Sequence, residues 1–218
     1  MLTKIYKVLF FLLFLAVQQS ALAQQRFYVG FILGGNLTQL DGDGAQGYDK
    51  LGLQAGTKIL GRLQENIYLS TEILYTQKGS NFEFKKNGRT FKQSIDLNYI
   101  SVPLIFTKRF RRIRVSPDHV YHRLSFSVGF AYSRLLNTEI NETEDDDIDF
   151  TASSFFYNNN DFSMQLGGGI AVNKHLEFEA RASISFNRIY DQREHPELLT
   201  GVVLLRNYYL MARIVYIL

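Results

Sequence analysis

The sequence predicts an all-β protein, an eight-stranded antiparallel up-and-down transmembrane β-barrel with long outer loops and shorter periplasmic turns. Two observations lead to this prediction. Eight segments beyond residue 24 alternate apolar and polar residues with a period of two, which is typical of strands with one apolar face. The connections between them alternate between long and short, as in a barrel whose loops gather at one end and whose turns gather at the other.

The first 23 residues have the composition of an export signal. Two lysines precede an apolar run over 8–17, and Ala21-Leu22-Ala23 supplies a small-x-small cleavage site. The apolar run is shorter than the roughly 20 residues that a membrane-spanning helix needs. We therefore expect a signal peptide at 1–23 and one outer-membrane β-barrel domain at 24–218.

The composition excludes several classes of function. The chain of 218 residues has no Cys, which removes disulfides, thiol nucleophiles and Cys-ligated metals. Without the two lysines of the signal peptide, 22 basic residues stand against 21 acidic ones, and this near balance argues against a nucleic-acid partner. The glycine run at 167–169 lacks the Lys-Ser/Thr of a phosphate loop, and we expect no cofactor.

Four alternating segments lie in the first half of the mature chain, at 26–36, 51–60, 67–84 and 89–108. The last two flank Asn87-Gly88, a hairpin signal because both residues tolerate positive φ. We expect these two strands to extend well beyond the others.

Four more segments follow, at 123–135, 161–172, 175–190 and 204–218. Long connections are expected at 37–50, around 79–94, at 136–160 and at 191–203, and short ones at 61–66 and 173–175. The connection at 109–122 is of medium length and is predicted to be a turn.

The stretch "HLEFEARASISFNRIY", residues 175–190, shows the two faces most clearly. Leu, Phe, Ala and Ile lie on one side, and Glu, Arg, Ser and Asn on the other. Across all the segments the polar face consists of Gly, Ser and Ala with a few large charged residues, which suits the side-chain-filled interior of a narrow barrel. We therefore expect the apolar face to contact outer-membrane lipid and the polar face to line the lumen.

A lone buried charge costs several kcal/mol, so charged residues on the polar face should form a buried ion-pair network. The predicted members are Lys58, Glu72, Glu177, Glu179, Arg181 and Arg213. A structural role for this network is the simpler interpretation, and a gated ion path is the alternative. A secreted lipocalin-like barrel with its apolar face inward around a ligand also remains open, because it would explain the export signal equally well.

Two motifs carry a family resemblance. The stretch "LYTQKGS" at 74–80, followed by "NYISVPLIF" at 98–106, resembles the PorT-like outer-membrane β-barrel family of Bacteroidetes. The resemblance implies an eight-stranded barrel in the outer membrane of a Gram-negative bacterium, and some relatives are associated with type IX secretion and gliding. Pro103, inside the second motif, cannot donate to the strand ladder, so we expect a bulge or local bend there.

Two charged stretches lie outside the expected strands. The acidic stretch 139–150 carries seven acids in twelve residues, and its weak metal-ligand candidates are Asp145, Asp146, Asp147 and Asp149. Their spacing does not match an EF-hand, so a solvated loop is the simpler interpretation. The medium turn carries a basic cluster of Lys108, Arg109, Arg111, Arg112 and Arg114, which could contact lipid phosphates or an acidic periplasmic protein.

These features favour a non-enzymatic outer-membrane protein with a structural or interaction role through its outer loops or its periplasmic turn. An accessory component of a secretion or transport complex, with a periplasmic or membrane protein partner, is the alternative. A hydrolase at the barrel rim, using Asp191 and His195, is a third hypothesis, but no other residue completes such a site. None of the four His residues is expected in a strand that faces the lumen.

Overall fold

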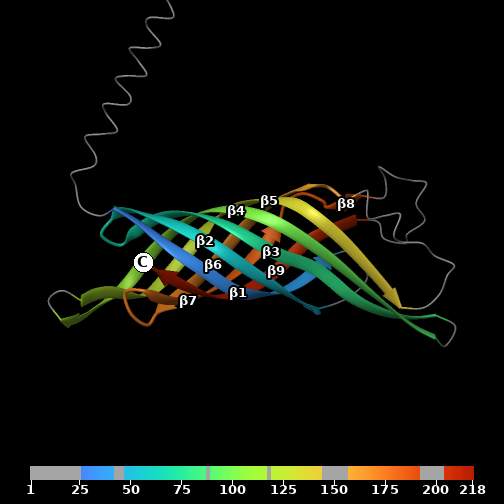
Figure 1. Ribbon diagram of the computed structural model, residues 1–218, viewed down its shortest axis with the longest axis horizontal. Coiled ribbons are helices and arrows are strands. Elements are labelled where there is room, and N and C mark those ends of the chain that lie inside the picture. Colours follow the sequence, from blue (N-terminus) through green and yellow to red (C-terminus); the bar gives the residue numbers. More distant parts are fainter. Residues whose placement is uncertain (1–25, 42–46, 87–88, 117–118, 144–156, 192–203) are drawn as a thin grey trace, which may run out of the picture.

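The computed structural model describes residues 26–41, 47–86, 89–116, 119–143, 157–191 and 204–218. Within these residues the chain forms one antiparallel sheet that closes on itself, because the first long strand pairs with the last (Figure 1). The strands are β1 (Phe27–Asp41), β2 (Lys50–Gln64), β3 (Ile67–Lys86), β4 (Arg89–Ser116), β5 (His119–Thr143), β6 (Asn160–Ala171), β7 (Leu176–Ser185), β8 (Tyr190–Asp191) and β9 (Leu204–Ile217). Eight of them make the ring, and the two-residue β8 pairs only with the start of β9.

The predicted fold class is confirmed, and each predicted segment overlaps one long strand. The expectation that the strands on either side of Asn87-Gly88 exceed all the others was wrong in part, because β5 has 25 residues and β3 has 20. The prediction for 109–122 was wrong, because β4 continues to Ser116 and β5 begins at His119. β5 pairs with β6 only from Leu124 onward, so the residues before it form a two-stranded hairpin that extends past the ring. Figure 1 shows this extension at the end of the barrel where the chain terminates, which we call the turn end; the opposite end is the loop end.

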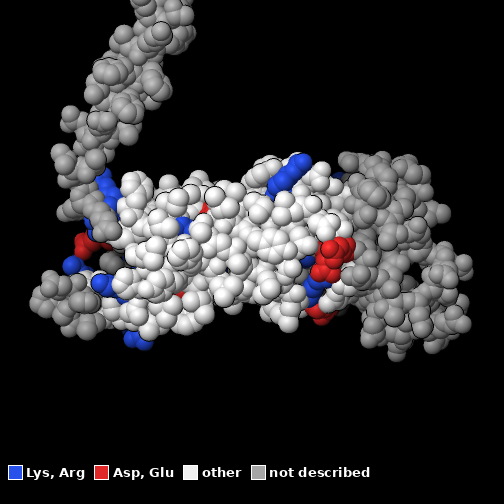
Figure 2. Space-filling view, in the orientation of Figure 1, with Lys and Arg blue, Asp and Glu red and all other residues white. Residues whose placement is uncertain are grey.

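Apolar side chains cover the outside of the ring. Leu51 is 79% exposed, Leu33 63% and Phe130 62%, whereas Glu177 and Arg181 are each 3% exposed. Figure 2 shows the result as a broad band almost free of surface charge, with Lys, Arg, Asp and Glu gathered toward the two ends. The prediction that the apolar face is turned outward is confirmed. A lipocalin-like barrel needs the opposite arrangement and is excluded.

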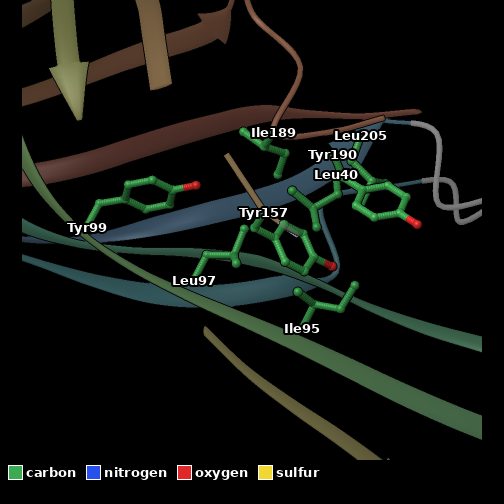
Figure 3. Packing of buried hydrophobic residues seen from close by; sticks show 8 residues of the cluster. All are labelled: Leu40, Ile95, Leu97, Tyr99, Tyr157, Ile189, Tyr190 and Leu205. Carbon is green, nitrogen blue, oxygen red and sulfur yellow. The ribbon is translucent and has the colours of Figure 1, made fainter. Parts of the chain in front are cut away.

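The lumen also contains apolar side chains, which the sequence-based assignment of faces did not single out. One cluster lies at the loop end, where side chains gather around Tyr157 (Figure 3). Its members are Leu40, Ile95, Leu97, Tyr99, Tyr157, Ile189, Tyr190 and Leu205. A second cluster occupies the wall formed by β9, β1, β2 and β3, and contains Ile32, Leu60, Tyr68, Leu74, Val215 and Ile217. The lumen is therefore a packed interior along much of its length.

Pro103 interrupts a ladder without shifting its register. Thr71 pairs with Leu104 and the ladder resumes at Leu74 and Ser101, with no pairing between them. The cause is the missing N–H of proline, which cannot donate to β3. The nearest register shift lies elsewhere, at Asn98 and Tyr99 on the β5 side, so the bulge expected at Pro103 is absent there. Among the described residues, no helix has the length and apolar character needed to cross a membrane.

Candidate functional site

Five charged side chains meet in the middle of the lumen, and we call them the central charge cluster: Lys58, Glu72, Glu179, Arg181 and Arg213. The strand register brings them together in pairs, with Lys58 opposite Glu72 and Glu179 opposite Arg213. Because β2 and β3 lie on one side of β1 and β7 and β9 on the other, the contacts between the two pairs cross the lumen.

Arg213 is the centre of the cluster. Its Nη2 lies 2.7 Å from Glu72 Oε1 and 2.6 Å from Glu179 Oε2, and its Nη1 donates to Glu72 Oε2 at 2.8 Å. Lys58 Nζ donates to Glu179 Oε1 at 2.7 Å. All five side chains are at most 6% exposed. Multiple charge-assisted hydrogen bonds of this kind compensate the cost of removing the ions from water.

The cluster carries one more cation than carboxylate, and Arg181 shows where the excess lies. Arg181 Nη2 donates to Glu179 Oε2 at 2.8 Å and to Glu72 Oε1 at 3.2 Å. Its Nε and Nη1 are buried without a hydrogen-bond partner in the described residues. Glycine makes room for these long side chains, because a Cβ on Gly167 would lie 2.5 Å from Arg181 Cγ, and one on Gly34 would lie 2.5 Å from Arg213 Cβ.

Glu177, the sixth predicted member, lies apart from the central charge cluster. Its Oε2 is 2.7 Å from Arg109 Nη2, and its Oε1 accepts a hydrogen bond from Ser125 Oγ at 2.6 Å. The structure therefore brings together five of the six predicted residues. The sixth, Glu177, pairs with Arg109 of the basic cluster instead.

Sequence reasoning missed a second buried pair, Lys78 with Asp161. Lys78 Nζ lies 2.7 Å from Asp161 Oδ2, and both side chains are at most 1% exposed. The ammonium also lies 4.5 Å from the ring centroid of Tyr99 and 4.8 Å from that of Tyr209, within the range of cation–π attraction. The signal was present, because Lys78 continues the period-two polar face that contains Glu72.

The basic residues predicted in the medium turn all lie on β4. Arg111, Arg112 and Arg114 are exposed, as is Lys108, whose Nζ lies 5.6 Å from the Phe110 ring centroid. Arg109 points inward, and its side chain is only 14% exposed. Arg111 has a left-handed backbone with φ of 53°, which is uncommon for a residue other than glycine.

A cavity of about 660 Å³ lies at the turn end, and we call it the turn-end pocket. Its Arg, Lys, His and Glu lining residues are Arg62, Glu65, Arg109, Arg112, His122, Lys174, His175 and Glu177. Leu60, Tyr68 and Ile217, which belong to the second apolar cluster, line it as well. Four cationic side chains therefore stand against two carboxylates.

Two histidines contribute to this pocket, and one corrects the sequence-based expectation. His122 lies on β5 and faces the pocket at the mouth of the lumen, where no His was expected. Partial burial, followed by the nearby charge of Arg109, holds the pKa of His122 below its ordinary value. His175 lies in the β6–β7 turn, with its Nδ1 2.7 Å from the carbonyl oxygen of Ile217.

The weak metal-ligand candidates, Asp145, Asp146, Asp147 and Asp149, lie outside the described residues, as do His195 and the side chain of Asp191. Cation binding by these aspartates stays a prediction. In the part of the chain that the structure describes, no group of three or more His, Cys, Asp or Glu side chains could hold a metal ion.

Comparison with known families identifies the barrel. A model of the family described as "Outer membrane protein beta-barrel domain" matches residues 18–191. The chain belongs to this family. Its cellular location is accordingly the outer membrane, with bilayer lipid around the apolar face of the ring. None of the curated proteins matches the sequence.

Three of the solved structures to which this chain is similar come from two bacteria. Ail of Yersinia pestis, in complex with the heparin analogue sucrose octasulfate, is 9% identical over 89% of this chain and 100% of its own, with a TM-score of 0.41. OprG of Pseudomonas aeruginosa is 10% identical over 89% of this chain and 97% of its own, with a TM-score of 0.44. The N-terminal barrel domain of OprF, also from P. aeruginosa, is 10% identical over 89% of this chain and 100% of its own, with a TM-score of 0.40.

Proposed function

We propose that the protein is a non-enzymatic outer-membrane barrel with a structural or interaction role, inserted with its turn end in the periplasm and its loop end outside. Residues 1–23 are the signal peptide that is removed on export. The observation that carries the proposal is the filled lumen. The central charge cluster joins β3 to β7 on opposite sides of the ring, and a packed apolar cluster lies at the loop end.

A filled lumen supports a role at the membrane surface because an eight-stranded ring is only wide enough for its own side chains. Arg181 and Glu72 illustrate this, since they come from β7 and β3 on opposite sides of the ring and Arg181 Nη2 lies 3.2 Å from Glu72 Oε1. A solute would have to break these ion pairs to pass. Contacts with other molecules are then made at the loop end and the turn end of the barrel.

The test is conductance in planar lipid bilayers, combined with heat-modifiable gel mobility in outer-membrane fractions. We expect a protein that changes mobility on boiling, fractionates with the outer membrane and gives no stable open channel. A persistent conductance would contradict the closed-lumen role. Recovery of the protein in the soluble periplasmic fraction would contradict the membrane assignment.

The second candidate is an accessory role in a secretion or transport complex, as in some PorT-like relatives. The motifs at 74–80 and 98–106 support it, and so does the β4–β5 hairpin, which carries exposed Arg112 and Arg114 past the ring. A photo-crosslinking residue at Arg114 in living cells separates the two candidates. A protein adduct of defined size at this position, absent when the crosslinker replaces the lipid-facing Phe130, supports a complex. The absence of a protein adduct supports the solitary barrel with its arginines at lipid phosphates.

A further inference from the structure

The turn-end pocket has the form of a ligand site and is unused by the proposed function. Its mouth is open to solvent, since the side chains of Arg112 and Glu65 are 55% and 72% exposed. Its inner wall is apolar, formed by Leu60, Tyr68 and Ile217. A volume of about 660 Å³ is within the range of pockets that bind small organic molecules.

Arg109 makes two contacts inside this pocket and leaves its Nε without a partner in the described residues. Its Nη2 pairs with Glu177 Oε2 at 2.7 Å, and its guanidinium lies 4.7 Å from the ring centroid of Tyr68. Arg109 Nε is buried and has no hydrogen-bond partner in the described residues. A buried donor without a partner is costly, so an acceptor that enters the pocket would satisfy it.

A second arginine, Arg112, lines the same pocket. In a regular strand, residues three positions apart point to opposite faces. Arg109 and Arg112 nevertheless both line the pocket, and Arg111 between them has a left-handed backbone. Such conformations cost on the order of 1 kcal/mol or more and concentrate at functional sites.

We propose that the turn-end pocket binds a small organic anion, with its carboxylate or phosphate group at Arg109 and Arg112 and its apolar or aromatic body against Leu60, Tyr68 and Ile217. The charge of the lining supports this class of ligand, since its four cationic side chains exceed its two carboxylates. Arginine suits either acidic group, because its planar fork of donors matches carboxylate and phosphate oxygens alike.

The test uses the absence of Trp from the chain. The variant Tyr121→Trp places a single fluorescent reporter in the pocket lining. The purified barrel in detergent is titrated with 3-phenylpropionate, with phenyl phosphate and with the neutral 3-phenylpropanamide. We expect saturable binding of at least one acid and binding of the amide that is weaker by about tenfold or more. The stronger of the two acids identifies the preferred acidic group.

The matched variants are Arg112→Gln and Arg114→Gln, which remove the same charge from the same strand, but only Arg112 lines the pocket. Arg112→Gln should weaken binding of the preferred acid by about tenfold, and Arg114→Gln should leave it within about twofold. Arg109→Gln alone would leave Glu177 without its cation. The contribution of Arg109 to binding is therefore tested with the double variant Arg109→Gln and Glu177→Gln, and heat-modifiable gel mobility shows whether this variant folds.

Three results would overturn the proposal: no saturation with either acid, equal binding of the amide, or equal weakening by the two arginine variants. If the reporter variant does not fold, calorimetric titration of the unaltered barrel with the same three compounds decides the question. Binding is measured on the isolated protein in detergent, so its failure leaves the proposed membrane role untouched.

Discussion

The central charge cluster and the turn-end pocket contain the same residue types in opposite surroundings. Glu72 in the cluster is fully buried and receives contacts from Lys58, Arg181 and Arg213. Glu65 at the pocket mouth is 72% exposed and has Arg112 as its ion-pair partner at 2.8 Å. An exposed ion pair contributes little to stability because water already solvates both ions. Removing the carboxylate from a buried pair costs much more, because the remaining cations are then buried without a counter-ion. Burial and the number of partners, more than the distance between the charged atoms, therefore decide what an ion pair contributes to stability.

The largest expected effect comes from Glu72→Gln. The substitution leaves three buried cations with one carboxylate, and it should lower the free energy of unfolding by about 3–5 kcal/mol. The measurement is a urea titration of the barrel folded in lipid vesicles, followed by the fraction with folded gel mobility. A decrease of less than about 1 kcal/mol in the free energy of unfolding would mean that water enters the central charge cluster and solvates its charges. The cluster would then resemble the exposed ion pair at the mouth of the turn-end pocket.

The outer face offers the next effect. Phe130→Arg places a charge in the middle of the apolar band and should cost about 2–4 kcal/mol in vesicles. Leu63→Arg is the control, because Leu63 is similarly exposed but lies near the turn end of β2, where an added arginine should cost about 0–1 kcal/mol. Equal costs at the two positions would show that the band does not match the depth of the bilayer.

Two adjacent glycines test how tightly the central charge cluster is packed. A Cβ on Gly34 would lie 2.5 Å from Arg213 Cβ, whereas a Cβ on Gly35 would meet nothing nearer than Gly52 O at 3.7 Å. A Cβ on Gly34 would also lie 2.5 Å from the backbone oxygen of Ala212. Gly34→Ala should therefore cost about 1–3 kcal/mol by pushing β9, and Arg213 with it, away from β1, and Gly35→Ala should be close to neutral. The same vesicle titration measures both variants, and a neutral Gly34→Ala would show that the cluster has room to shift.

Glu65→Gln should have the smallest effect. The exposed pair with Arg112 contributes about 0–1 kcal/mol, and salt reduces it further, so stability should change little. Binding of the preferred acid in the turn-end pocket should instead become somewhat stronger, because one competing carboxylate is removed. Titration with and without about 0.5 M salt separates the two contributions. A large loss of stability would show that the pocket mouth is as tightly coupled as the central charge cluster.

The sequence predicted the orientation of most residues because period-two alternation survives in nearly every strand. The face that carries Glu177, Glu179 and Arg181 was assigned to the lumen from that pattern together with its Gly- and Ser-rich composition. It failed at 109–116, where closely spaced arginines and the left-handed Arg111 break the alternation that marks a strand. The pairing of Lys78 with Asp161 was missed for another reason. Contacts across a lumen depend on the tilt of the strands and on the length of the side chains. A local sequence pattern determines neither which strands face each other nor at what height.

The same cross-lumen contacts constrain the order in which the barrel can assemble. Arg213 lies 141 residues beyond Glu72 along the chain, and it is carried by the strand that closes the ring onto β1. Until that strand arrives, Glu72 and Glu179 lack their best-connected counter-ion. A barrel that lacks this strand would keep Lys58 and Arg181 against the two carboxylates, but it would lose the four hydrogen bonds that Arg213 donates to them. The interior gains its full electrostatic stabilisation only when β9 pairs with β1 and closes the ring. The cluster thereby makes completion of the ring a cooperative event and leaves incomplete barrels poorly stable.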